Sequence, residues 1–150
     1  MKICRWLVLT TLAVLAGCGG GDSPTAPSRT TLQLAGAWTG RLSYTFEGTA
    51  YFHTVDATIS QDRLNIKATL TLSSDWRATL EGTLSEQGTG AQLPARITFD
   101  TPSDSPPMRC AAGFNATSSP VAPTMTFQAS TVTFTNCDST ITGVQLTLQR

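Results

Sequence analysis

The feature of this sequence that most constrains its fold is a period of two in the apolar residues, which begins at Leu34 and continues to the end of the chain. Apolar side chains alternate with threonine, serine, asparagine and charged side chains over residues 38–46, 51–59, 64–72, 95–99, 110–114, 125–129 and 144–148. Successive side chains of a β-strand point to opposite faces of its sheet, so this period predicts strands with one buried face and one face in water. The alternation changes phase near Ser130, before Val132 and Phe134, which indicates a bulge or a tight turn.

Short connections rich in turn-forming residues separate these segments, at residues 47–48, 61–62, 73–75, 87–90 and 138–139. Short turns join antiparallel neighbours, because parallel strands need long crossovers. Residues 76–84 also fit helical spacing, but Thr79, Gly82 and Thr83 favour a strand there. We therefore predict an all-β fold, an antiparallel up-and-down meander of about eight strands that closes into a small barrel and so removes its exposed edges, with a two-sheet β-sandwich as the alternative.

Residues 1–18 have the order of an export signal. A short basic segment (residues 1–5) precedes an apolar run (residues 6–16) that is too short to cross a bilayer as a helix, and the run ends in Leu15-Ala16-Gly17-Cys18. This tetrapeptide resembles the lipobox of bacterial lipoproteins. The resemblance implies cleavage between Gly17 and Cys18 and a diacylglyceryl thioether on Cys18, which anchors the chain to a membrane of the cell envelope. Gly19 rather than Asp follows the cysteine. If the host has two membranes, the resemblance therefore also implies that the protein is anchored to the outer membrane and faces the periplasm or the cell surface.

The expected domain organisation follows from these boundaries. Residues 1–17 form the signal peptide, residues 18–33 the lipidated cysteine and a flexible Gly/Ser/Pro tether, and residues 34–150 one all-β domain. The chain has 10 basic and 10 acidic residues, and loss of Lys2 and Arg5 with the signal leaves 10 − 2 = 8 basic residues against 10 acidic ones. A field this weak does not provide the electrostatic attraction on which nucleic-acid binding depends, so we expect no nucleic-acid partner.

The four cysteines have three expected fates. Cys4 leaves with the signal and Cys18 takes the lipid, which leaves Cys110 and Cys137 as an even pair. An exported chain meets an oxidising compartment, so we predict a disulfide between them, with two buried free thiols as the alternative. A zinc site is disfavoured, because two thiolates and one distant histidine do not complete a tetrahedral ligand set.

The start of the first predicted strand, Gly36-Ala37-Trp38, resembles the Gly-x-Trp signature of the calycins, the lipocalin-like barrels. The end of the chain, residues 137–150, looks like the end of many small uncharacterised bacterial lipoproteins. The calycin resemblance implies that Trp38 lies at the closed end of the barrel and that Arg150, on the last strand, packs over it through a cation–π contact. A fold of this kind does not by itself define a function, so the interior and the surface have to be weighed residue by residue.

Two uses of the predicted interior are open. Aromatic side chains and the single histidine face it from several strands: Trp38, Tyr44, Phe46, Tyr51, His53 and Phe127. These side chains suit a cavity that holds a small hydrophobic ligand, and they equally suit a small barrel that is filled by its own side chains.

Motifs of catalysis are missing from the sequence. His53 shares its parity with Tyr51 and Val55 and should point inward, whereas Asp56 points outward, so no carboxylate on that strand orients the imidazole as in a triad. There is no Gly-x-Ser-x-Gly, His-Glu-x-x-His or phosphate-binding glycine motif. We expect no enzymatic activity, no cofactor and no metal. The predicted function is that of a lipid-anchored structural or interaction module with an envelope protein as partner, and the alternative is a lipocalin-like binder of a small hydrophobic ligand.

Overall fold

The computed structural model describes residues 32–150 except 88–89, 103–105, 107–109, 122 and 136. These residues form nine β-strands and one short 3-10 helix, with the bounds β1 Gly36–Phe46, β2 Thr49–Asp62, β3 Asn65–Leu72, η1 Ser73–Asp75, β4 Arg77–Thr83, β5 Ser85–Gln87, β6 Gly90–Asp100, β7 Ala111–Ser118, β8 Thr124–Thr133 and β9 Thr140–Gln149. The expected signal peptide, the cleavage site between Gly17 and Cys18, and the tether up to residue 31 lie outside the described residues.

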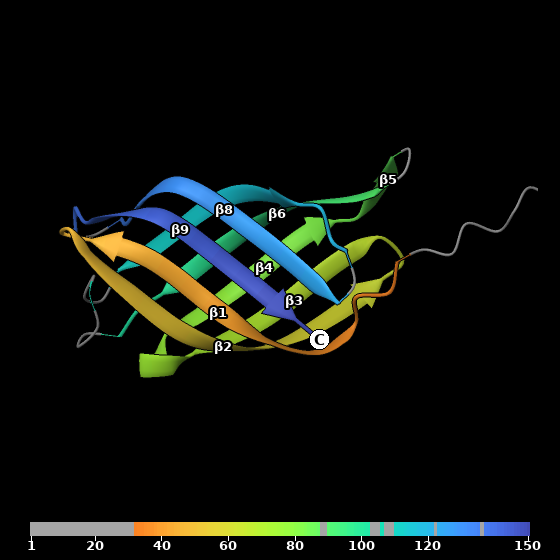
Figure 1. Cartoon of the computed structure of the whole chain (residues 1–150), viewed down its shortest axis with the longest axis horizontal. Helices are drawn as coiled ribbons and strands as arrows, with labels where there is room; N and C mark the ends of the chain where they lie inside the picture. Colours follow the sequence, from red (N-terminus) through yellow and green to blue (C-terminus); the bar gives the residue numbers. More distant parts are fainter. Residues whose placement is uncertain (1–31, 88–89, 103–105, 107–109, 122, 136) are drawn as a thin grey trace, which may run out of the picture.

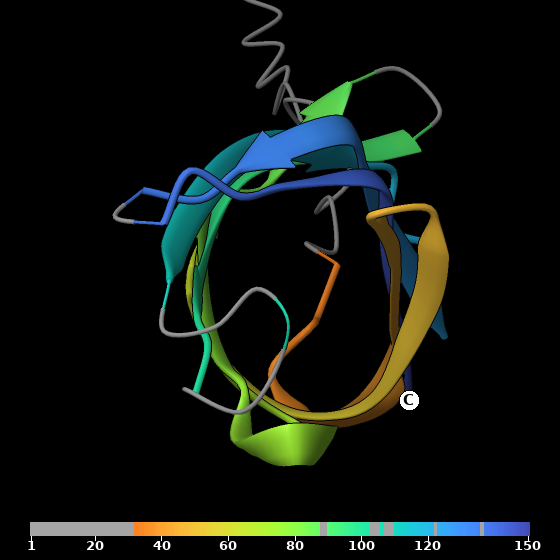
Figure 2. The ribbon, with the colours of Figure 1, turned by 90° about the vertical axis from the view of Figure 1, so that its left-hand side faces the viewer.

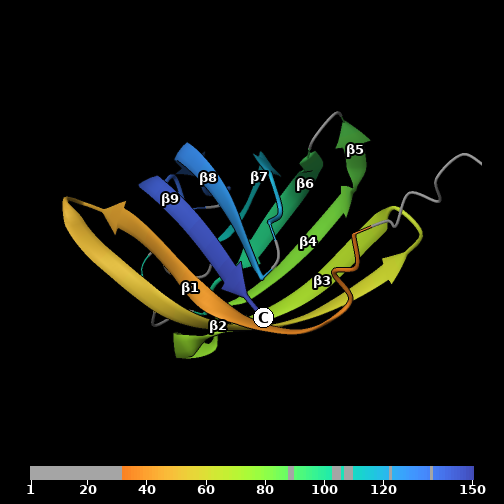
Figure 3. The ribbon, with the colours of Figure 1, turned by 45° about the vertical axis from the view of Figure 1, so that its right-hand side comes forward.

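The eight longer strands follow one another around a nearly closed barrel (Figure 1, Figure 2). Each pairs antiparallel with the next from β1 to β4, β4 pairs with β6 and β6 with β7, while β8 pairs with β9 and β9 returns to β1. The three-residue β5 pairs with β6 and extends beyond the barrel (Figure 3). The predicted antiparallel meander is confirmed, it forms a nearly closed barrel, and residues 76–84 supply the strand β4.

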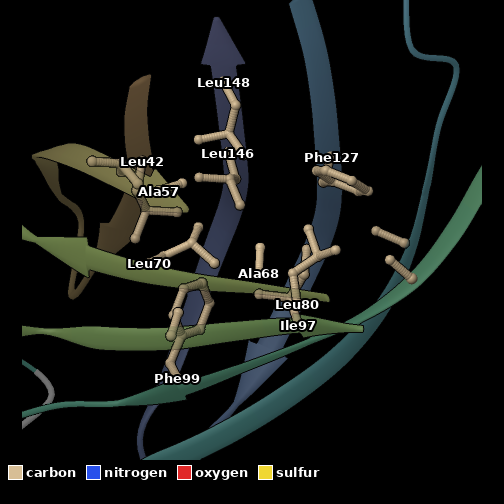
Figure 4. Close-up of a cluster of buried hydrophobic side chains, with 14 of the residues drawn as sticks. Leu42, Ala57, Ala68, Leu70, Leu80, Ile97, Phe99, Phe127, Leu146 and Leu148 are labelled. Atoms are coloured by element: carbon tan, nitrogen blue, oxygen red, sulfur yellow. The ribbon is translucent and has the colours of Figure 1, made fainter. Parts of the chain in front are cut away.

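The two-residue period places the hydrophobic core inside the barrel. In β3, Ile66 and Leu70 are buried, whereas Lys67 and Thr69 are exposed. Figure 4 shows buried side chains from neighbouring strands meeting in the interior. Complete burial of one leucine or isoleucine side chain contributes about 1.5–3 kcal/mol, so the alternation seen in the sequence is the main source of the barrel's stability.

The barrel is incomplete at the seam, the line where β7 lies beside β8. These two strands are not joined by a ladder of backbone hydrogen bonds. At one end of the seam the Thr135 N–H donates to the Ala111 carbonyl (2.9 Å), and a disulfide joins Cys110 and Cys137, whose Cα atoms are 6.0 Å apart. The predicted disulfide is therefore present, and it reinforces with a covalent bond the single backbone bridge at this end of the seam.

A change of phase in β8 accompanies the seam. The inward parity of β8 switches at Ser130, as predicted, and β9 switches at the facing residue Gly143, whose φ of +59° suits glycine. Because both strands gain a residue at the same level, the register between β8 and β9 runs unbroken, and the shift lies between β9 and β1, at Ser43 and Thr45.

The barrel has two different ends. At the entry end β1 begins, and residues 62–65 and 118–124 connect strands; at the loop end lie the turn at residues 47–48, η1, and the connections after β6 and β8. The entry end is on the right in Figure 1, and the loop end faces the viewer in Figure 2.

The segment before β1 closes the entry end. Leu34 is buried, its N–H donates to Gln61 Oε1 (2.7 Å), and the Gln61 amide donates to the Leu32 carbonyl (3.0 Å). The indole N–H of the buried Trp38 donates to the Leu34 carbonyl (2.7 Å). Covered backbone groups thereby gain the partners that burial requires, and the segment is fixed across the opening.

Candidate functional site

The six side chains predicted to line the interior do not form one group. Two of them lie apart, Trp38 near the entry end and Phe127 deep in the core (Figure 4). The remaining four come from the last residues of β1 and the first residues of β2 at the loop end: Tyr44, Phe46, Tyr51 and His53.

An aromatic cluster fills the loop end of the barrel. Its members are Tyr44, Tyr51, His53, Trp76, Phe99 and Phe134. The tight turn between β1 and β2 sets the register that places Tyr44 opposite Tyr51, with ring centroids 5.5 Å apart and ring planes 12° from parallel. Trp76 follows η1, and its ring lies 5.4 Å from that of Tyr44 and 4.7 Å from that of His53. Aromatic pairs of this kind add about 0.5–1.5 kcal/mol each beyond burial, so the cluster stabilises this end of the barrel.

Hydrogen bonds link the polar atoms of the cluster to the backbone. The Tyr44 hydroxyl donates to the Pro106 carbonyl (2.8 Å), and His53 Nε2 lies 3.2 Å from the same hydroxyl oxygen. His53 Nδ1 lies 2.8 Å from the Ser73 carbonyl oxygen. Because a carbonyl only accepts, Nδ1 carries a proton, and the Ser73 carbonyl orients the imidazole. In the neutral ring Nε2 is an acceptor, so the single Tyr44 hydroxyl proton can serve either the Pro106 carbonyl or this nitrogen.

Burial keeps both of these side chains uncharged at neutral pH. It lowers the pKa of His53, and the hydrogen bond to Ser73 offsets part of that shift. Burial, reinforced by the neighbouring Tyr51, raises the pKa of Tyr44 far above its usual value of about 10. Among the described residues no carboxylate hydrogen-bonds to either ring. The arrangement thus holds an imidazole and a phenol in fixed positions, with both side chains in their uncharged forms.

Three members of the cluster were not predicted as site residues: Trp76, Phe99 and Phe134. Their parity places them inside the barrel, but parity does not show at which end of the barrel two strands bring their side chains together. Trp76 carries an unusual feature, since its buried indole N–H has no hydrogen-bond partner within the described part of the chain. A buried donor without a partner costs about 1–3 kcal/mol.

The middle of the barrel is filled by its own side chains. A void large enough to admit water would leave accessible surface on the atoms around it. Side chains from strands on all sides of the barrel have no such surface: Leu42, Leu70, Leu80, Ile97, Phe99, Phe127, Leu146 and Leu148. At these positions the interior of the barrel is packed with its own side chains.

The outer surface of the described barrel carries several shallow hollows, two of which lie beside the seam. One of these two is polar. Arg96, Asn115, Thr117 and Gln128 line it, so guanidinium, amide and hydroxyl groups are offered there. The Arg96 guanidinium lies over Gly113, where a Cβ atom would come within 2.6 Å of Nη2. Across the described residues no group of three or more His, Cys, Asp or Glu side chains gathers in a way that could hold a metal ion.

The two segments that carry the calycin resemblance, the start of β1 and the end of β9, lie side by side at the entry end. The Arg150 guanidinium lies over Gly36, where a Cβ atom would be 3.3 Å from Nη2, and Gly36 has a φ of +130° that other residues rarely adopt. Arg150 thus covers the residue two positions before Trp38. A cation–π contact occurs elsewhere on the barrel, where the Arg41 guanidinium lies 4.1 Å from the ring centre of Phe52.

Comparison with known proteins adds no relative to these observations. A scan against protein-family models found no matching family, and searches of the curated proteins and of the solved structures found no match. Within the described ranges, no helix has the length and apolar character needed to cross a membrane.

Proposed function

We propose that this protein is a lipid-anchored interaction module of the cell envelope that contacts its partner through the outer surface of the barrel. The observation that carries the proposal is the filled interior, because leucine and phenylalanine side chains occupy the space that a carrier would reserve for its cargo. Leu15-Ala16-Gly17-Cys18 supplies the anchor in this proposal.

Kinship with the calycins is part of the same proposal. It is supported by the position of Trp38 beneath the segment that closes the entry end, and by the Arg150 guanidinium over Gly36. Since fold does not define function, this kinship adds no ligand or activity to the proposal.

The anchor is tested by the mass of the N-terminal peptide of the protein recovered from membranes of a bacterial host. We expect a peptide that starts at Cys18 and carries acyl chains, and we expect Cys18→Ser to yield an unlipidated, uncut chain. Normal processing of Cys18→Ser would overturn the anchor.

The partner is sought with a photo-crosslinking amino acid placed on the outer surface of the full chain in its host. Gln128, beside the seam, and Thr69, on β3, sample different sides of the barrel. We expect a discrete crosslinked species at one position and not at the other. Absence of any adduct at positions spread over every exposed strand face would contradict an interaction module.

A second candidate is a carrier of a small hydrophobic ligand, and one observation favours it: the buried Trp76 N–H lacks a partner within the aromatic cluster. A ligand with a hydrogen-bond acceptor would satisfy that donor. Native mass spectrometry on protein purified gently from its host distinguishes the two functions. Bound mass that is released as one compound on denaturation would establish the carrier, and a bare polypeptide mass favours the interaction module.

A further inference from the structure

The two ends of the barrel differ in charge. The exposed ionisable side chains at the loop end are mostly acidic: Glu47, Asp75, Arg77, Asp100 and Asp138. The connections and strand ends of the entry end have both signs, with Asp62, Arg63 and Arg150, and with Glu86 on β5. The described part of the barrel therefore has an acidic pole at the loop end, while the entry end is close to neutral.

Exposed apolar side chains are also unequally placed. Leu64, in the connection between β2 and β3, is 43% exposed, and Val121, between β7 and β8, is 70% exposed. Both connections belong to the entry end. The backbone beneath them is fixed, since the Leu84 N–H donates to the Leu64 carbonyl (2.7 Å) and Val121 exchanges two hydrogen bonds with Thr124 (3.0 and 2.7 Å). A third large exposed side chain, Phe52, lies under the Arg41 guanidinium on the side of the barrel.

The chain itself reaches the barrel at this same end. Leu32, the first described residue, is bound to Gln61 beside the Leu64 connection. The distance in sequence from Cys18 is short, because 31 − 18 = 13 residues, numbers 19–31, lie between Cys18 and Leu32. Covalent geometry allows at most about 3.3–3.6 Å per residue, so these residues span no more than about 50 Å. An anchor at Cys18 therefore keeps the entry end within a few nanometres of the lipid surface.

We propose that the entry end of the barrel rests on the bilayer surface, with Leu64 and Val121 in the headgroup region and the acidic loop end directed away. This inference rests on the proposed lipid anchor and adds an orientation and a contact to it. Three observations agree on the entry end: the chain reaches the barrel there, two exposed aliphatic side chains lie there, and the excess of acidic groups lies at the opposite end. Anionic headgroups repel the acidic pole and attract Arg63 and Arg150, so an anchored barrel that turned its loop end to the membrane would be disfavoured. The orientation leaves the seam and the sides of the barrel open to a partner.

The test uses the full lipidated chain in vesicles of phosphatidylethanolamine and phosphatidylglycerol. A nitroxide is attached in separate variants at Leu64→Cys and Val121→Cys at the entry end, and at Glu47→Cys as the matched control at the loop end. Collision with oxygen, which concentrates in lipid, is compared with collision with a water-soluble nickel chelate. We expect the ratio of oxygen to nickel collisions to be several-fold higher at positions 64 and 121 than at position 47. Equal, water-like ratios at all three positions would overturn the orientation.

A second measurement guards against effects of the label. Hydrogen exchange is measured for the unlabelled lipidated chain in vesicles and, as the unanchored control, for a chain that begins at Gly19 in buffer. Exchange around residues 63–64 and 119–121 should be slower in the vesicle-bound chain only. The substitutions Leu64→Asp and Val121→Asp together should remove that protection without releasing the protein from the vesicles. Failure of the inference and failure of the anchor are distinguishable: an unlipidated chain in the supernatant refutes the anchor, whereas a vesicle-bound chain with unprotected connections refutes only the orientation.

Discussion

Replacing Cys110 and Cys137 together by alanine removes the disulfide and measures how much it contributes to the free energy of unfolding. The bond joins residues separated by 27 positions, so it closes a loop of 27 + 1 = 28 residues. In the chain-entropy relation, −2.1 − 1.5R ln 28 is about −12 cal/mol/K, or about 3.6 kcal/mol at 25 °C. Domains are stable by only about 5–15 kcal/mol, so the double substitution to alanine should remove a quarter or more of the unfolding free energy. The loss should also be local, because apart from the disulfide that end of the seam is held by Thr135 bonded to Ala111.

Urea unfolding followed by tryptophan fluorescence gives the magnitude, since Trp38 and Trp76 report on the two ends of the barrel. Hydrogen exchange gives the location: amides of β7 and of the second half of β8 should lose far more protection than those of β3. Wild-type protein treated with a phosphine reductant is the matched control, because it breaks the bond and keeps both sulfur atoms. A loss below about 1 kcal/mol, at the low end of the range seen for native disulfides, or an equal loss of protection in β3 and β7, would refute the reasoning.

Three further outcomes follow from single positions. Gly40→Ala should cost about 3 kcal/mol or more, because a Cβ atom there would overlap the Thr147 carbonyl oxygen where β1 approaches β9; an unchanged thermal midpoint would contradict that close approach. Burial lowers the pKa of His53, so as the pH falls the unfolded chain binds a proton at this side chain before the folded chain does, near pH 6.5. The contribution of His53 to the free energy of unfolding is therefore fully present above that pH, and it is lost as the pH falls toward the folded pKa. Denaturant titrations should show that the free energy of unfolding falls with falling pH in the wild type and falls less in His53→Gln. An identical pH dependence in both proteins would assign the effect to other groups. Gln61→Ala should cost about 1–3 kcal/mol and speed exchange of the Leu34 amide, its hydrogen-bond donor, and persistent protection of that amide would show that Gln61 does not hold the segment.

The fold was predictable because its main determinant is local. Alternation in each segment fixes which side chains face inward, and short turns fix antiparallel order, so the meander followed from residues a few positions apart. The phase change at Ser130 was equally local. The matching phase change at Gly143 was not predicted, because only the pairing of β8 with β9 shows that Gly143 lies beside Ser130.

The candidate site was predictable only in part. Tyr44 and Tyr51 flank one turn, so their meeting depends on a single hairpin. The approach of Trp76 to His53 depends instead on η1 and on how far the strands are staggered around the barrel, which no local pattern encodes. The same stagger places Trp38 and Phe127 away from the loop end, although all of them share the inward parity.

The pairing of β1 with β9 means that the first strand of the barrel to be synthesised cannot complete its pairing until the last strand of the barrel has been made. Arg41 lies opposite Thr147, so 147 − 41 = 106 positions separate residues that are direct neighbours in the sheet. Contacts of such separation form slowly, and until they form, β1 presents an open edge to other chains. Every incomplete chain that ends before residue 140 lacks β9 and can form only an open sheet. The period in which this domain is exposed to aggregation is thus set by the time needed to deliver the ten residues of β9, and an early stop in translation yields an open sheet that can pair with other chains.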